Sequence, residues 1–303
     1  MILKNIAFFI GIAGLAQCQV PDIRECNEKL NPGFGYGVNQ PDQTFEMTAA
    51  LREISGLSLS EDDHLLTLND EQSKVFKINR FSGLQMDETQ FDEDGGDFEG
   101  LEMVGQTVFA VKSKGKLYAI YNFAQREKRS VETFSCPELS KAADVEGLSY
   151  DPQRKLLLLA CKGPRLNETD REIWSFDAAE KKFGSEPILK ISYQQIRNWL
   201  TDHKADMNIF SDFTAEIPQA FHFGCSGIAV HPKTGQYFIL SSPGKLLLVC
   251  KSDGSVVNLL KLDKKIHMQP EGIVFAADGT MYICNEGKKE SGPKIYRFAE
   301  NSK

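Results

Sequence analysis

One short motif recurs five times along the chain, and it constrains the fold more than any other feature. Each copy has an acidic residue or a serine, then a glycine, a short apolar strand, a turn and a second apolar strand. The residues that precede the five glycines are Ser55, Glu99, Glu146, Ser226 and Glu271. Ser55 and Glu99 are 44 residues apart, Glu99 and Glu146 are 47 apart, and Ser226 and Glu271 are 45 apart. Repeats of about 40 to 50 residues are typical of the four-stranded blades of β-propellers.

The sequence therefore predicts an all-β fold, a five-bladed β-propeller. Short runs of apolar and alternating residues indicate three strands in each repeat and leave room for a fourth. The interval from Glu146 to Ser226 is longer, at 80 residues, and leaves a six-bladed propeller as the alternative. Residues 192–204 carry apolar side chains at helical spacing, and Ser192 is a suitable N-cap. This pattern favours a helical insertion between blades three and four.

The N-terminal segment predicts export. Residues 1–18 contain one lysine and then an apolar run from Ile6 to Ala16, which is the length of a signal-peptide core and too short for a membrane span. The sequence before Cys18 allows simple cleavage, and it also resembles a bacterial lipobox, in which Cys18 would carry lipid. Residues 19–45 are rich in turn-forming residues and are expected to be a tether or irregular lead-in, with the propeller over residues 46–300. We expect a periplasmic or cell-envelope protein that contacts membrane only through a lipid at Cys18.

Composition narrows the classes of partner. The net charge is −7 and no basic stripe is visible, which argues against nucleic acid. The seven cysteines include no Cys-x-x-Cys pair, and they indicate at most one or two disulfides. The ligand or protein partner of the chain is not indicated.

The repeated glycine has a physical reason. Inner strands of a propeller crowd near the axis, where a residue without a side chain lets neighbouring backbones approach. The five residues before the glycines should then converge at one mouth of the central channel. Three carboxylates held together repel one another, and a hard divalent cation removes that repulsion. Calcium accepts carboxylate, hydroxyl, carbonyl and water oxygens, so a calcium site is predicted; alternatively, the glutamates cap the inner strands without an ion. The predicted ligands of the calcium ion are Glu99, Glu146, Glu271, Ser55 and Ser226.

The same residues carry a family resemblance. The five motifs in order, together with Asn285-Glu286 and the segment Leu68-Asn69-Asp70-Glu71, resemble the SdiA-regulated (YjiK-like) family of bacterial envelope proteins over about residues 48–298. The resemblance implies a five-bladed propeller distantly related to NHL-repeat proteins, with a calcium ion near the glutamates at 99, 146 and 271. It implies no established biochemical activity.

Two function classes remain open. A binding or scaffold module would use the ion to stiffen the propeller, whereas a calcium-dependent hydrolase (lactonase, phosphoesterase or phytase-like) would use it to polarise a substrate oxygen. The hydrolase needs a base, for which the sequence offers His64, His222 and His267, and no nucleophile motif is visible. Lys112, Lys162 and Lys288 follow second strands and could bind phosphate. Because no catalytic residue can be assigned, a binding role is favoured.

Overall fold

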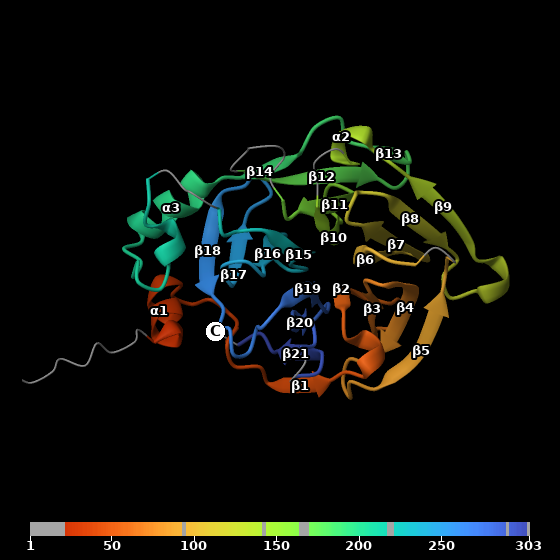
Figure 1. Ribbon diagram of the computed structural model, residues 1–303, viewed down its shortest axis with the longest axis horizontal. Coiled ribbons are helices and arrows are strands. Elements are labelled where there is room, and N and C mark those ends of the chain that lie inside the picture. Colours follow the sequence, from red (N-terminus) through yellow and green to blue (C-terminus); the bar gives the residue numbers. More distant parts are fainter. Residues whose placement is uncertain are drawn as a thin grey trace, which may run out of the picture.

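The computed structural model has five β-sheets arranged as blades around a central axis in the residues that it describes, as Figure 1 shows. These residues are 22–92, 95–140, 144–163, 170–216, 221–288 and 291–301. The prediction of an all-β, five-bladed propeller is confirmed, and the described ranges contain no sixth blade. The expected signal peptide, including Cys18, lies outside the described residues.

Each blade is an antiparallel sheet. In the first four blades, the strands run in sequence order from the axis to the rim. Blade one contains β2 (Ile54–Leu59), β3 (Leu65–Asn69), β4 (Gln72–Ile78) and β5 (Gln85–Gln90). Blade two contains β6 (Phe98–Val104), β7 (Thr107–Lys112), β8 (Leu117–Tyr121) and β9 (Ser130–Phe134). Blade three contains β10 (Val145–Asp151), β11 (Leu156–Cys161), β12 (Arg171–Asp177), β13 (Lys182–Phe183) and β14 (Leu189–Ile191), the last two pairing with opposite ends of β12. Blade four contains β15 (Cys225–Val230), β16 (Tyr237–Ser241), β17 (Leu246–Cys250) and β18 (Val256–Lys261).

The fifth blade joins the two ends of the described chain. Its inner strands are β19 (Pro270–Phe275), β20 (Met281–Asn285) and β21 (Lys294–Phe298), and its outer strand is β1 (Gln43–Glu46), which pairs with β21. A strand from the beginning of the chain therefore completes the last blade and closes the ring. The propeller starts three residues before position 46, because Gln43 already belongs to this sheet.

The segment expected to be a tether or lead-in is packed against the propeller from Asp22 onward, so a free tether is wrong for this part. Helix α1 (Ile23–Leu30) begins at the N-cap Asp22 and lies along blade four. Three asparagines of the segment pair with the backbone of the outer strand β18 and the residues after it. Asn31 accepts from Leu259 N and donates to Leu259 O, and Asn27 does the same with Lys261. These side-chain amides replace the missing fifth strand at an edge that would otherwise expose unpaired backbone groups.

The predicted helical insertion is confirmed. Helix α3 (Tyr193–Asp202) follows blade three, and the Ser192 hydroxyl accepts from Gln195 N as its N-cap. The 3-10 helix η3 (Ser211–Phe213) comes next. Buried residues of both pack with blades three and four in one apolar cluster, which explains the insertion's helical spacing of apolar residues. The remaining short helices are η1 (Ala49–Leu51), η2 (Arg126–Lys128) and α2 (Pro137–Ser140).

The core lies in the seams between blades. Among the described residues, the buried apolar side chains divide into five clusters, each filling one seam. The inner strands β2, β6, β10, β15 and β19 each contact the inner strands of both neighbouring blades and so form a ring. Because both faces of these strands are covered, β2, β10, β15 and β19 are buried along nearly their whole length and β6 is partly buried, whereas the rim strand β5 is largely exposed.

The glycines of the motif lie where the inner strands approach most closely, as predicted. A Cβ on Gly56 would lie 3.0 Å from the backbone of Gly100, and a Cβ on Gly272 would lie 2.7 Å from the backbone of Gly56. A Cβ on Gly227 would lie 3.3 Å from Gly272. Any larger residue there would push two inner strands apart, which is why glycine recurs at this position.

Two further features bear on the expectations for export. Within the described ranges, no helix has the length and apolar composition needed to cross a membrane. None of the six cysteines in these ranges forms a disulfide, and five of them are buried as small apolar residues; they are Cys136, Cys161, Cys225, Cys250 and Cys284.

Candidate functional site at the propeller axis

Each of the five residues before the glycines lies at an irregularity in the inner hairpin of its blade. In blade two, Phe98 pairs with Lys112 and Gly100 with Val111, so Glu99 has no partner across the strand pair. The same shift occurs at Glu146, Ser226 and Glu271, and a related one follows Ser55. A β-bulge re-aims the side chain of the extra residue. The fold therefore turns four of these side chains out of the sheet pattern at the same end of the channel, whereas Ser55 keeps Leu68 as its partner.

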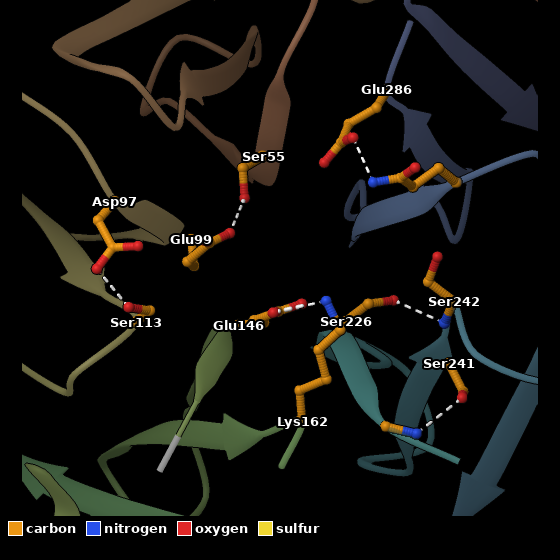
Figure 2. Close-up of polar contacts among 12 residues, drawn as sticks. Ser55, Asp97, Glu99, Ser113, Glu146, Lys162, Ser226, Ser241, Ser242 and Glu286 are labelled. Atoms are coloured by element: carbon orange, nitrogen blue, oxygen red, sulfur yellow. Dashed lines mark hydrogen bonds and ion pairs between the residues drawn. The ribbon is translucent and has the colours of Figure 1, made fainter. Parts of the chain in front are cut away.

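These residues form the inner ring of the candidate site, defined as Ser55, Glu99, Glu146, Ser226 and Glu271. Figure 2 shows four of them arranged around a common centre. The Ser55 hydroxyl donates to Glu99 Oε2 at 3.3 Å, across the boundary between blades one and two. Glu146 Oε1 accepts from Lys162 Nζ at 2.7 Å. The structure thus brings the inner-ring positions of successive blades together, as the motif predicted.

Ser226 differs from the other members. Its hydroxyl donates to Pro270 O at 2.7 Å and accepts from Ser242 N at 3.1 Å, and its side chain is fully buried. The donated bond ties blade four to blade five, and the accepted bond fixes the turn after β16 within blade four. These two bonds hold Ser226 in place, and its role as a calcium ligand, like that of the other four residues, stays a prediction.

A second set of residues surrounds the inner ring, and only one of them, Lys162, was predicted from the sequence as a candidate binding residue. The last residue of the second strand in each blade pairs with the residue before the inner-ring position, and the chain then turns. The next residues are equivalent in the five blades, and we call them the outer ring: Asp70, Ser113, Lys162, Ser242 and Glu286. The signal was present in the repeat, because each follows a predicted second strand directly. Together the rings hold five carboxylates and one lysine.

The carboxylates of the inner ring are buried close to one another. Burial raises the pKa of Glu99 from 4.5 to about 7, and the charges of Asp70 and Asp97 add to the effect. Burial raises the pKa of Glu146 to about 8, although its ion pair with Lys162 opposes the shift. Burial and the charges of Glu146 and Glu286 raise the pKa of Glu271 well above its ordinary value. All three glutamates therefore resist ionisation in the absence of a further positive charge.

The acidic members of the outer ring behave in the same way. Burial and the charges of Glu53 and Glu71 raise the pKa of Asp70 to about 6. Burial and the charges of Glu53, Asp70 and Glu99 raise the pKa of Glu286 to about 8. Burial alone would lower the pKa of Lys162, but the charge and hydrogen bond of Glu146 outweigh it and raise the pKa. One ammonium group thus faces five acidic groups.

The donor set is compatible with a hard cation. In the described part of the chain, no three His, Cys, Asp or Glu side chains are grouped closely enough to form a ready-made metal site. Two carboxylate oxygens, Glu146 Oε2 and Asp70 Oδ1, are nevertheless buried without a hydrogen-bond partner, as are both polar atoms of the Asn285 side chain. Buried polar atoms are normally paired, so these oxygens are suited to an ion or to water. Apart from the Lys162 ammonium group, which is not a metal ligand while it is protonated, the two rings present only side-chain oxygens, which favours calcium over zinc.

The three histidines suggested as bases do not join the rings. His267 is fully buried, its Nε2 lies 2.7 Å from Val38 O, and burial lowers its pKa to about 4. His64 begins β3 at the end opposite Asp70, next to Asp62. His222 is exposed in the segment before β15. Of the predicted lysines, Lys162 belongs to the outer ring, whereas Lys112 lies over the Phe98 ring at 4.8 Å from its centre.

The part of the chain that contains the five motifs matches a known protein family. The sequence profile of the SdiA-regulated family matches residues 35–289, which is well over half of the chain. The chain belongs to the SdiA-regulated family. The matched range includes every member of both rings and extends from the residues before β1 to the turn after β20. No curated protein matches the chain in sequence.

Solved structures share the fold of this SdiA-regulated protein at low sequence identity. The glutaminyl cyclase of Myxococcus xanthus is 11% identical, with a TM-score of 0.56 over 86% of this chain and 96% of that chain. The PQQ-bound aldose sugar dehydrogenase of Streptomyces coelicolor is 12% identical, with a TM-score of 0.49 over 86% and 99% of the two chains. A streptogramin B lyase is 10% identical, with a TM-score of 0.45 over 85% and 68%. At these identities the likeness is one of fold.

Proposed function

We propose that this SdiA-regulated propeller is an exported cell-envelope protein that holds a calcium ion at its axis and acts as a binding or scaffold module. One observation carries the calcium assignment. Five carboxylates from four blades face a single lysine, and burial and mutual repulsion raise the pKa of each of them. A divalent cation would let these groups ionise together without repulsion.

Particular residues would hold the ion. Glu146 of blade three presents an unpaired buried oxygen, and Glu99 and Glu271 occupy equivalent bulge positions in blades two and five. Asp70 and Glu286 of the outer ring provide further oxygens, while Ser55 is bonded to Glu99 and can orient it. When bound, the ion would supply a fixed positive charge that stiffens the ring of inner strands. The lysine and the apolar run within residues 1–18 support export, because they have the pattern of a signal peptide.

A second candidate function is a calcium-dependent hydrolase. The observation in its favour is Glu99, whose pKa is raised to about 7, near the value that suits a general acid or base at neutral pH. Glu99 is also less buried than Glu146 and Glu271. The three candidate histidines lie outside the rings, so a hydrolase would have to use this carboxyl group as its proton carrier.

Calorimetry with calcium tests the proposal. The full mature chain should bind calcium with a measurable heat and melt at a lower temperature after chelation. Glu146→Gln should weaken binding by tenfold or more, because it replaces the anionic ligand that carries the unpaired oxygen. The matched control is Glu102→Gln, since Glu102 is another buried glutamate of β6 with a pKa raised to about 8 by burial, but it contacts Ser58 and belongs to neither ring.

The possible results separate the two functions. If the wild type shows no heat of calcium binding and no change in melting temperature after chelation, the proposal of a calcium ion at the axis is refuted. An equal loss of calcium affinity in Glu146→Gln and Glu102→Gln would refute the assignment of the calcium site to the two rings. Calcium-dependent turnover of lactones or phosphoesters that disappears in Glu99→Gln would favour the hydrolase over the binding module.

A further inference from the structure

Residues 33–40 cover the seam between blades four and five, and we call this segment the strap. It connects the end of helix α1 with strand β1. Its Tyr36 and Val38 are buried in the apolar cluster of the seam, together with side chains of both blades. Gly33, Phe34 and Tyr36 also line two cavities, one of about 150 Å³ beside α1 and one of about 830 Å³ beside the turns of blades four and five. The strap therefore lies between these cavities.

The first of two buried histidines that contact the strap is His231, in the turn between β15 and β16. Its Nδ1 accepts from Lys233 N and Thr234 N, both at 3.3 Å, so the proton of the neutral ring lies on Nε2. Nε2 lies 2.8 Å from the Tyr36 hydroxyl, which donates to Gly279 O at 2.7 Å. The neutral ring thus donates to the strap through one nitrogen and accepts from its own turn through the other.

Blade three has an acid at the equivalent position. Asp151, like His231, ends the inner strand and precedes a proline. Asp151 Oδ1 accepts from Gln153 N and Arg154 N. Its Oδ2 accepts from the Tyr237 hydroxyl. The turn therefore needs a hydrogen-bond acceptor at this position, and blade four supplies it with an imidazole nitrogen that ceases to accept when it is protonated.

The second histidine, His267, precedes β19 and is fully buried. Its Nε2 lies 2.7 Å from Val38 O, which can only accept, so Nε2 carries the proton and Nδ1 is left without a hydrogen-bond partner. The ring packs against Tyr296 and Phe298 of β21, with centres 5.7 and 6.1 Å away. A proton added at Nδ1 would place a positive charge and an unpaired N–H in this apolar seam.

The charged groups around His231 do not offset the cost of protonation. Burial lowers the pKa of His231, and the charge of Lys233 adds to this shift while that of Glu300 opposes it. Lys233 and Glu300 are also paired with each other, at 2.5 Å. Burial and the charges of Glu300 and Asp278 raise the pKa of Tyr36, so the hydroxyl that faces His231 stays neutral.

The surroundings of His267 have the same effect. Burial lowers its pKa to about 4, against the opposing effects of the bond to Val38 O and the charge of Asp263, and the charge of Lys245 lowers it further. Burial raises the pKa of Tyr296, whose ring also faces His267. Both histidines are therefore neutral while the strap covers them.

We propose that the strap is a pH-sensitive latch, which the neutral rings of His231 and His267 hold closed over the seam and which opens when these rings are protonated at Nδ1. Opening exposes the charged rings to water and so removes the cost of burying them. It also uncovers the apolar seam and joins the two cavities. The latch does not depend on the proposed calcium ion, because neither histidine belongs to the inner or the outer ring.

The direction of the pH dependence follows from linkage. The pKa of an exposed histidine is about 6.5, so the open strap binds more protons than the closed one below this pH. The closed strap is therefore most stable above about pH 6.5 and loses stability as pH falls towards the folded-state pKa of His267, about 4. Between pH 7.5 and pH 5.0, His267 alone should raise the population of the open strap by about tenfold or more.

Hydrogen exchange of the full mature chain at pH 7.5 and pH 5.0, corrected for intrinsic amide exchange, tests this inference. The Asn301 amide donates to Gly35 O and the Asp263 amide donates to Asn39 Oδ1, both at 2.8 Å, so these two amides report on the closed strap. Their opening should increase by about tenfold or more at pH 5.0. Amides of β3 and β4 in blade one should keep their protection, because the strap does not cover that blade.

Two substitutions remove the titrating rings and keep one bond each. His267→Gln retains an amide N–H for Val38 O, and His231→Asn retains an acceptor for the turn, as Asp151 provides in blade three. The double variant should change its opening by less than about twofold between the two pH values. His222→Gln is the matched control, because His222 is exposed and lies outside the strap, and it should respond to pH as the wild type does.

Three results would overturn the inference. Wild-type protein whose reporter amides open equally at both pH values has no latch. An equal increase at the amides of blade one would mean acid unfolding of the whole propeller. A wild-type response in the double variant would exclude the two histidines as its cause. Melting curves at pH 7.5 check that the variants fold, and if the double variant does not, an undiminished response in His267→Gln overturns the inference by itself.

Discussion

Asn31 offers a direct test of how the chain before β1 stabilises the propeller. It is almost fully buried, and its side chain pairs with both backbone groups of Leu259 on the edge strand β18. The N–H of Leu259 lies 3.1 Å from Asn31 Oδ1, and the Leu259 carbonyl lies 2.9 Å from Nδ2. Leu259 itself is fully buried. Asn31→Ala therefore leaves one buried donor and one buried acceptor without partners.

The expected loss of stability follows from these two groups. A buried polar group that loses its partner costs about 1 to 3 kcal/mol. Two such groups would cost up to about 6 kcal/mol, but water that enters the vacated space will satisfy part of this demand. We expect the free energy of unfolding to fall by about 3 kcal/mol in Asn31→Ala. Asn198→Ala is the matched control, because Asn198 lies on the exposed side of α3 and bonds only to Gln194 among the described residues.

Two measurements check this prediction. Equilibrium unfolding in guanidinium chloride should show a lower midpoint for Asn31→Ala with an unchanged slope, and a change within about 0.5 kcal/mol for Asn198→Ala. Hydrogen exchange should accelerate at the Leu259 amide more than at Lys261, whose amide is bonded to Asn27. A loss below about 0.5 kcal/mol, or equal acceleration at both amides, would refute the idea that individual asparagines seal the edge.

Two further predictions concern the axis. Gly272→Ala should lower the unfolding free energy by about 1 to 3 kcal/mol, because its Cβ would lie 2.7 Å from the backbone of Gly56 and 2.8 Å from Cys284 Sγ. Gly37→Ala is the control, because a Cβ on Gly37 would lie 3.8 Å from the nearest atom and should have little effect on the melting temperature. Equal shifts of the melting temperature in the two variants would contradict the close approach of the inner strands. In chelator-treated protein, stability should fall as pH rises from about 4.5 to about 8, because the pKa of Glu146 is raised from 4.5 to about 8 on folding and the folded state binds more protons in that range. Chemical denaturation across this pH range should show a smaller fall for Glu146→Gln, and the same fall in both proteins would contradict the role of Glu146.

Local repetition made the fold predictable from the sequence. The acid-or-serine and glycine motif recurs with the spacing of a blade, and each copy is followed by strands short enough to recognise from apolar runs. The insertion was also predictable, because Ser192 and the apolar spacing behind it are local helix signals. The five inner-ring positions could be named in advance for the same reason: equivalent positions in a closed ring must converge on one axis.

Hydrogen-bond partners were not predictable from the same pattern. The motif treats Ser55 and Ser226 alike, yet the Ser55 hydroxyl donates to the side chain of Glu99, whereas the Ser226 hydroxyl donates to the backbone of Pro270 and accepts from Ser242 N within its own blade. The outer ring was overlooked because Asp70 and Glu286 appear in the sequence only as charged residues in turns. Their place beside the glutamates depends on how the second strand of each blade ends, which is a property of the assembled sheets.

The sequence by itself determined the repeat, the inner glycines and the acidic character of the axis, because each of these depends on residues close together in the chain, and it left five or six blades open. Only the tertiary structure decided how the ring closes and which groups meet. Strand β1 completes a blade whose other strands lie more than two hundred residues later, and Asn31 reaches Leu259 across a separation of 228 residues. Such contacts have no local pattern, because any polar residue in a turn-rich segment could equally face solvent until the propeller places an unpaired strand edge beside it.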